Sequence, residues 1–195
     1  GLASVMDKKD FILASASPQR FALLEQIGCP PKKVAPADID ETTRLHETPT
    51  EYVKRMALEK ALKVAELYPN ENVLAGDTIV AVGRRVLHKA HSDEEQTEVM
   101  NLLSGRACRV ISAVCLVSRD GKISKRCVET RVITKKMSAD EIKDYVASHE
   151  WVGCCGYKIE GRFAGYVSKI IGSYSGIVGL PLFETQNMLK GIGVK

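Results

Sequence analysis

The chain has 195 residues, of which 45% are hydrophobic and 27% are charged, a composition typical of a globular protein with one core. Its formal net charge of +4 suits phosphorylated small molecules and does not require nucleic acid as a partner. No apolar run approaches the length of a membrane span, and residues 1–10 are too short and polar for a secretory signal. We therefore expect a flexible segment over 1–10, a single domain over 11–195, and no association with a membrane.

The six cysteines favour a reducing, cytoplasmic location. No two of them form a Cys-x-x-Cys pair, so the sequence does not indicate a zinc ribbon. Several lie in apolar segments, where cysteine behaves as a small core residue. We expect all six to be free thiols, and a redox role for the adjacent Cys154 and Cys155 is the alternative.

The first motif is a turn between a predicted strand and a predicted helix. Residues 11–13 form a short apolar run, and apolar residues recur at helical spacing after the turn. Ser17 suits the N-cap and Pro18 the first helical position, so the helix start offers backbone N–H groups and a positive dipole end to an anion. Ser15 and Arg20 add donors that match phosphate oxygens. The alternative is an ordinary capped helix with a surface arginine.

Helices and strands alternate along the rest of the chain, and at least two connections read as hairpins. We therefore expect an α/β fold with a mixed central sheet flanked by helices. A Ser or Thr followed three residues later by Glu predicts capping boxes at Thr48, Ser92 and Ser138. The expected elements are an edge strand and acidic loop over 29–47, a helix to about 67, strands over 73–82 and 86–89, a helix to about 104, strands over 107–118 and 122–136, a helix over 138–149, a strand over 165–171 and a last helix from 177 to about 190.

Asp77 is the most informative residue. It interrupts, with Gly76, a nearly continuous apolar strand over 73–82. A buried carboxylate is costly unless it is paired, hydrogen-bonded or bound to a metal. Lys60, on the apolar stripe of the preceding helix, and Lys89 could supply compensating charge. The alternative for Asp77 is an aspartate at a turn where the strand ends.

The acidic loop offers further carboxylates. Asp40 and Glu41 could serve as oxygen ligands for Mg²⁺, and we take Asp77 and Glu41 as the candidate metal ligands. A solvated acidic loop is the alternative. The four histidines lack metal-ligand spacing and read as surface residues. The sequence contains neither a Walker-type phosphate loop nor a Gly-x-Gly-x-x-Gly turn, so a P-loop kinase or a Rossmann enzyme is unsupported.

Several short motifs follow one another in a specific order. They are Leu13-Ala14-Ser15-Ala16-Ser17-Pro18-Gln19-Arg20, Lys60-Ala61, Gly76-Asp77-Thr78, Leu87-His88-Lys89, Leu102-Leu103-Ser104-Gly105, Gly156-Tyr157, Gly172-Ser173-Tyr174 and Val178-Gly179-Leu180-Pro181-Leu182. Each motif alone is weak, but the ordered set resembles the Maf family of nucleoside triphosphate pyrophosphatases. The resemblance extends over roughly residues 11–190.

The resemblance implies a fold shared with inosine triphosphate pyrophosphatases, an elongated two-lobed mixed sheet with the site in a cleft. It implies hydrolysis of a nucleoside triphosphate, including non-canonical or modified ones, to the monophosphate and pyrophosphate in cleansing of the nucleotide pool. Mg²⁺ or another divalent cation such as Mn²⁺ is the implied cofactor, and a homodimer is the suggested assembly. The implied catalytic residues are Lys60, Asp77 and Lys89, and the implied triphosphate-binding residues are Ser15, Ser17 and Arg20.

Three positions bear on the choice of base. The family branch that acts on thymidine and uridine triphosphates usually has arginine, threonine and glutamine where this chain has Gln19, Thr78 and Glu160. Thr78 matches that branch, whereas Glu160 resembles the branch that acts on 7-methyl-GTP, and Gln19 matches neither. The pocket is therefore mixed, and the sequence favours no single base.

Two other classes of function stay open at this stage. A non-catalytic, nucleotide-sensing regulator of cell division or septum formation is the main alternative. A single-stranded nucleic-acid binder is weaker, because an aromatic content of 6% offers few stacking platforms.

Overall fold

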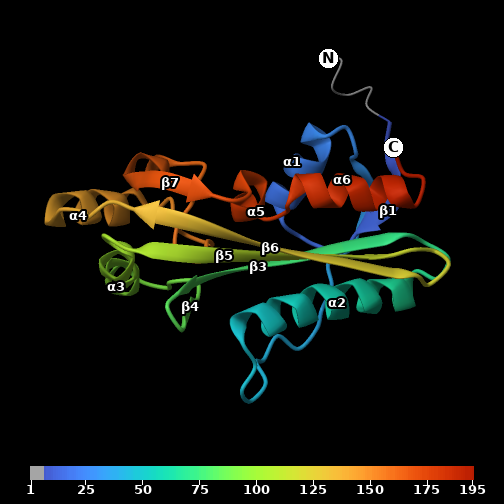
Figure 1. Cartoon of the computed structure of the whole chain (residues 1–195), viewed down its shortest axis with the longest axis horizontal. Helices are drawn as coiled ribbons and strands as arrows, with labels where there is room; N and C mark the ends of the chain where they lie inside the picture. The colour runs from blue at the N-terminus through green and yellow to red at the C-terminus, as the bar shows by residue number, and fades with distance from the viewer. Residues whose placement is uncertain (1–6) are drawn as a thin grey trace.

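The computed structural model describes residues 7–195 and consists of helices packed on one long, twisted sheet (Figure 1). The elements are β1 (Lys9–Leu13), α1 (Pro18–Gln26), β2 (Pro31–Val34), α2 (Pro49–Leu67), β3 (Val73–Val82), β4 (Arg85–Leu87), α3 (Asp93–Leu103), β5 (Ala107–Val117), β6 (Ile123–Thr134), α4 (Ala139–Ser148), the 3-10 helix η2 (Arg162–Tyr166), β7 (Val167–Ile171), α5 (Tyr174–Val178) and α6 (Leu182–Gly191).

The sheet is mixed, as the sequence predicts. Its strands follow the order β2-β1-β3-β5-β6-β7, and β4 pairs with β3 beside this path. β1 runs parallel to β2 and β3, whereas the other pairings are antiparallel. The predicted hairpin between β5 and β6 is confirmed, and Gly121 in its turn has a φ of +85° that suits glycine.

Helices cover the sheet differently at its two ends (Figure 1). At one end α2 packs on one face, and α1 and α6 pack on the other, whereas α3 and α4 lie at the opposite end. The buried side chains accordingly form three clusters, one under α2, one under α1 and α6, and one around α3 and α4. The apolar residues of α2 are buried at helical spacing, at Val53, Met56, Ala57, Ala61 and Val64. The expectation of an elongated, two-lobed α/β fold is confirmed.

The predicted helix starts are largely confirmed. Thr48 and Ser138 form complete capping boxes with Glu51 and Glu141. At Ser92 the box is only half formed, because the side chain of Glu95 accepts from the backbone of His91 instead.

The C-terminal part of the chain differs from the prediction. The expected last helix is two helices, because α5 begins at the Ser173 cap and ends at Gly179, whose φ is +145°. Pro181 then occupies the N-cap position of α6 without a capping side-chain hydrogen bond. The strand expected over 165–171 begins at Val167, after η2.

The N-terminal boundary also differs slightly. β1 begins at Lys9 rather than at Phe11, so it takes up the last residues of the segment expected to be flexible. Residues 1–6 of that segment lie outside the described residues.

A change of strand partners along β3 creates the setting of the site. β1 pairs with β3 only at Val73 and Leu74, and β4 pairs with it from Val80. Between these pairings, residues 75–79 have a strand partner only in β5 within the described chain. Here β1 ends and the chain turns into α1, an arrangement in which open α/β sheets commonly bind ligands.

The backbone at Gly172 offers a test of how β7 connects to α5. Its φ is +132°, and a Cβ there would lie 2.7 Å from Oγ1 of Thr130. We expect Gly172→Ala to lower the free energy of unfolding by more than about 1 kcal/mol, measured by chemical denaturation. Gly121→Ala is the control, because it shares a positive φ but its Cβ would meet nothing within 4 Å. Equal losses of unfolding free energy in the two variants would contradict a clash between the new Cβ and Thr130.

Candidate active site

A cavity of about 1080 Å³ opens beside the interval of β3 that pairs with β5 alone within the described chain. Its walls come from the turn before α1, the acidic segment before α2, the middle of β3, the residues after β4, and the glycine-rich stretch before η2. All of the site residues predicted from the sequence line it, namely Ser15, Ser17, Gln19, Arg20, Glu41, Lys60, Asp77, Thr78, Lys89 and Glu160. Residues far apart in the chain thus share one cavity.

An ion pair between Lys60 and Asp77 lies at the centre of this cavity. Nζ of Lys60 lies 2.9 Å from Oδ1 of Asp77 and 3.2 Å from Oε1 of Glu41. The Lys60 and Asp77 side chains are only 16% and 13% exposed. The predicted charge compensation by Lys60 is therefore confirmed, and β3 continues through Asp77, so the turn alternative is wrong.

Burial raises the pKa of Asp77 above its ordinary value, while Lys60 and Arg20 oppose this rise. Two nearby cations therefore support the ionised form of a carboxylate that is largely removed from water. A carboxylate in this state can accept a hydrogen bond from water or coordinate a cation.

Arg20 connects α1, β3 and α5. Its Nε donates to the carbonyl of Gly179 at 2.7 Å, one terminal nitrogen lies 3.4 Å from Oγ of Ser15, and the other lies 3.3 Å from Oγ1 of Thr78. Gly76 allows this approach, because a Cβ there would meet Nε of Arg20 at 3.1 Å. These contacts use three of the five guanidinium N–H groups and leave two for a ligand.

The start of α1 offers fewer free N–H groups than the sequence suggests. Ser17 caps the helix by accepting from the Arg20 backbone at 3.2 Å, while its own N–H donates to Ser15. Pro18 has no N–H. The hydroxyl of Ser17 also donates to Oε1 of Gln19 at 3.2 Å, which leaves the Gln19 amide nitrogen available.

Lys89 approaches the cavity from the far side. Its backbone pairs with Cys155 in an isolated antiparallel bridge, and its exposed side chain forms no ion pair with any residue from 7 to 195. Burial raises the pKa of the Cys155 thiol. The charge of Lys89 opposes this rise in pKa, and the charge of Asp77 adds to it. The charges of Lys89 and Asp77 are therefore both felt at Cys155, although Lys89 makes no direct ion pair with Asp77.

Glu160 lies in the glycine-rich stretch and is exposed. Lys158, two residues earlier, lines the same cavity. The pKa of the nearby Cys154 thiol is raised mainly by burial, and Lys158 lowers this pKa while Glu160 raises it. The wall that carries Glu160 therefore also carries a basic side chain.

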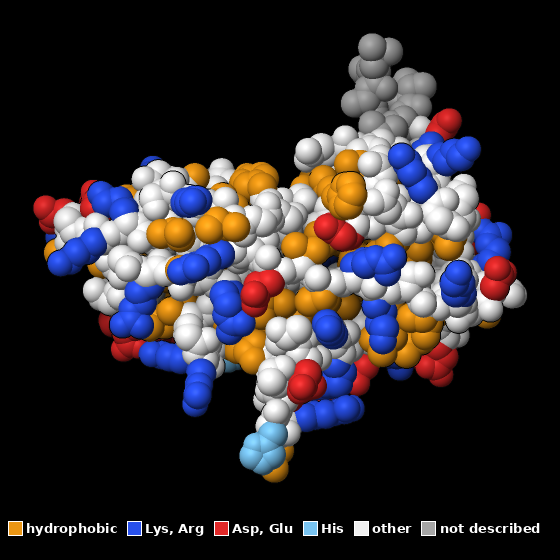
Figure 2. Space-filling model, viewed as in Figure 1, with side chains coloured by type: hydrophobic (Ala, Val, Ile, Leu, Met, Phe, Trp, Pro, Cys, Tyr) orange, Lys and Arg blue, Asp and Glu red, His pale blue; other side chains and the backbone are white. Residues whose placement is uncertain are grey.

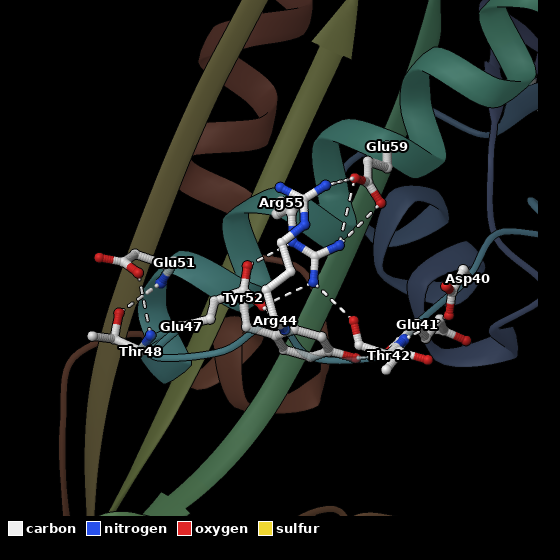
Figure 3. A network of polar contacts seen from close by, with 10 residues as sticks. All are labelled: Asp40, Glu41, Thr42, Arg44, Glu47, Thr48, Glu51, Tyr52, Arg55 and Glu59. Atoms are coloured by element: carbon white, nitrogen blue, oxygen red, sulfur yellow. Dashed lines mark hydrogen bonds and ion pairs between the residues drawn. The ribbon is translucent and has the colours of Figure 1, made fainter.

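The acidic segment before α2 forms a wall of the cavity through Glu41, Thr42 and Glu47 (Figure 3). Arg55 of α2 holds Glu47 in a two-pronged ion pair with distances of 2.6 and 2.8 Å, and it donates to the carbonyl of Thr42 at 3.0 Å. This pairing lowers the pKa of Glu47 from its ordinary 4.5 to about 2. Asp40 instead turns back to accept from the Thr42 N–H, so its candidacy as a ligand is not supported by its contacts.

Sequence reasoning missed several residues around this site. Arg55 and Tyr52 shape the acidic segment, Ser112 bonds Thr78 at 2.9 Å, and Lys158 lines the cavity. Lys158 could have been found from its position two residues before Glu160. Ser112 could not, because it meets Thr78 only through the register of β3 against β5.

Other expectations from composition can be compared with the structure. All six cysteines, each within the described residues, are unpaired, and Cys29, Cys108 and Cys115 are buried. The four histidines are exposed. Across residues 7–195 we find no helix whose length and apolar character would let it cross a membrane.

The low pKa of Glu47 predicts how stability depends on pH. Because this pKa is 4.5 ordinarily and about 2 in the folded state, its stabilising contribution is fully present above pH 4.5 and is lost as pH falls toward 2. We expect the difference in free energy of unfolding between wild type and Glu47→Gln to shrink over that interval, measured by urea denaturation. Glu66→Gln, at an exposed position of α2, should show no such trend. A pH-independent difference for Glu47→Gln would contradict the assignment.

Comparison with known proteins agrees with this architecture. The chain is 48% identical over 185 residues to the dTTP/UTP pyrophosphatase of Caulobacter vibrioides, covering 94% of this chain and 96% of that protein. It is 49% identical over 183 residues to the dTTP/UTP pyrophosphatase of Paramagnetospirillum magneticum, covering 93% and 96%. The solved structure of a HAM1 protein from Coxiella burnetii is similar in fold, with a TM-score of 0.52, 16% identity and coverage of 95% and 100%. The Maf-like protein profile matches residues 10–192, and the chain belongs to this family.

Proposed function

We propose that this protein is a nucleoside triphosphate pyrophosphatase that hydrolyses dTTP or UTP to the monophosphate and pyrophosphate. The observation that carries this proposal is the meeting of one largely buried carboxylate, Asp77, with Lys60, Lys89 and Arg20 around a single cavity. The two relatives named above, both dTTP/UTP pyrophosphatases, support the reaction and the substrate class. A nucleotide-pool cleansing role in the cytoplasm follows from that reaction and from six unpaired cysteines.

Binding of the triphosphate falls to the basic side chains and the start of α1. Phosphoryl transfer depends mainly on positioning and on neutralising charge that spreads over the phosphate oxygens. Arg20 has two free N–H groups after its contacts with Gly179, Ser15 and Thr78. Lys89 carries an ammonium that no carboxylate of the described chain engages, so it is free to meet a phosphate.

Asp77 acts on the attacking water. Its carboxylate keeps one oxygen on Lys60 at 2.9 Å, which leaves the other oxygen to accept a hydrogen bond from water. The burial that raises its pKa also makes it a better proton acceptor than an exposed aspartate. Lys60 holds the carboxylate in place and limits its protonation.

The carboxylates of Asp77 and Glu41 also suit a divalent cation. They converge on the same ammonium, at 2.9 and 3.2 Å, so both point to one small region. No group of three or more potential ligands gathers anywhere in residues 7–195, and Mg²⁺ typically needs only one or two carboxylates beside substrate phosphates. A bound Mg²⁺ or Mn²⁺ would neutralise phosphate charge.

Product analysis with a nucleotide panel tests the reaction. We expect release of pyrophosphate from dTTP or UTP, and we expect Asp77→Asn and Lys89→Ala each to lower the rate at least about a hundredfold, the scale of a lost electrostatic group. Asp120→Asn, in the turn between β5 and β6, is the matched control and should keep full activity. Circular dichroism checks that each variant is folded. Release of orthophosphate, or nucleotide binding without turnover, would overturn the proposed reaction, and the latter would favour the sensing alternative.

Glu160 is the proposed reader of the base. It lines the cavity, and a carboxylate accepts hydrogen bonds only, so it favours a base edge rich in N–H donors. The free amide nitrogen of Gln19 acts in the opposite direction, since a donor suits the O2 and O4 of uracil or thymine. The Thr78 hydroxyl contacts Arg20, Ser112 and the Gly179 carbonyl instead. With these opposing preferences the protein accepts dTTP and UTP, but its selectivity for them over guanine nucleotides is not maximal.

The variant Glu160→Gln tests this proposal. Relieving an unpaired polar contact is worth about one to three kcal/mol, so relative kcat/KM should shift toward UTP and dTTP by up to about a hundredfold against GTP and 7-methyl-GTP. The amide of Gln19 reduces the size of this shift. Glu98→Gln, at an exposed position of α3, should leave the rank order unchanged. An unchanged rank order in Glu160→Gln would mean that this carboxylate does not read the base.

A further inference from the structure

We propose that Arg55 is a positioning residue that holds the segment 41–47 against α2 and thereby sets Glu41 toward Lys60. The cavity wall formed by this segment would then depend on a side chain that does not itself line the cavity. The catalytic part of this inference rests on the proposed function. The structural part, that Arg55 orders the segment, does not.

The contacts of Arg55 join two parts of the segment to α2 (Figure 3). Its guanidinium holds both carboxylate oxygens of Glu47 and the carbonyl of Thr42, while Glu59 of the same helix accepts from it at 3.3 Å. The Arg55 and Glu47 side chains are only 13% and 8% exposed. A planar fork with several donors can make this set of contacts, whereas a lysine ammonium cannot.

Tyr52 lies one helical turn before Arg55 and completes the attachment. Its hydroxyl donates to the carbonyl of Glu41 at 2.7 Å. Arg55 and Tyr52 therefore hold the backbone of two consecutive residues, Thr42 and Glu41, from the same face of α2. The side chain of Glu41 then reaches Lys60, which belongs to the same helix.

Apolar packing does little to hold the segment in place. No apolar side chain from residue 36 to 52 is buried, and Leu45 is 88% exposed. The segment forms a loop that projects beyond α2 in Figure 1 and Figure 2, without regular secondary structure from 35 to 44. Since hydrophobic burial does not fix this loop, polar contacts must supply its order, and Arg55 makes the most enclosed of them.

Kinetics of Arg55→Met test the catalytic part. We expect kcat/KM to fall at least about tenfold in a folded protein, because small misplacements in an active site are costly. Arg44→Met is the matched control and should stay within about twofold, since Arg44 is 68% exposed and reaches Glu59 only at 3.5 Å. Because Arg55 acts through Glu41, Glu41→Gln should cost less in the Arg55→Met background than in wild type. Additive losses in that double-mutant cycle would overturn the inference.

Amide hydrogen exchange tests the structural part without any substrate. We expect the amides of residues 41–47 to exchange faster in Arg55→Met than in wild type, while those of β3 and β5 are unchanged. Unchanged exchange in 41–47 would overturn the inference. If wild type hydrolyses no nucleotide, the proposed function fails and hydrogen exchange alone decides the role of Arg55. If Arg55→Met does not fold, Tyr52→Phe measured in the same two ways decides, since it removes only the donor to Glu41.

Discussion

The ion pair between Lys60 and Asp77 is the interaction on which the rest of the site depends. A carboxylate in the middle of a central strand would protonate or destabilise the fold without a partner, because burial already raises its pKa. Lys60 supplies that partner from α2, in which Met56 and Val64, one turn before and one turn after it, are fully buried. The packing of α2 on the sheet therefore fixes the distance of the Lys60 ammonium from β3. The same contact draws Glu41 toward Asp77, so one cation orders both carboxylates.

The sheet makes room for this ion pair by leaving part of β3 without a second strand. Consecutive residues of a strand point to opposite faces, so Asp77 turns to Lys60 while Thr78 turns to Arg20 and Ser112. Both faces of β3 thus contribute to one cavity at this interval. The turn before α1 and the stretch that carries Glu160 line the rest of the cavity. The segments that bound the cavity are attached to the core in different ways.

These attachments differ in kind. The strand and helix residues of the site are held by apolar packing, whereas the acidic segment is held by the polar contacts of Arg55 and Tyr52. Apolar packing resists small displacements because interiors are densely packed. Displacing a loop that is held by hydrogen bonds and an ion pair costs less than displacing a densely packed element. Basic side chains are spread over the face seen in Figure 2 with acidic ones among them, and the net charge of +4 favours anionic ligands overall.

The sequence by itself determined most helix starts and the mixed sheet, because caps and apolar periodicity are local signals, and it predicted residues that the structure brings to one cavity. It also indicated that Asp77 needs a compensating cation, with Lys60 and Lys89 as the candidates, since a buried carboxylate is costly alone. Only the tertiary structure decided that Arg20 meets the carbonyl of Gly179, that Ser112 lies behind Thr78, and that Arg55 holds the acidic segment. Those contacts depend on strand register and on how a loop folds back over its helix. No local pattern encodes them, because the partners lie far apart in the chain or bond through the backbone, which carries no residue identity.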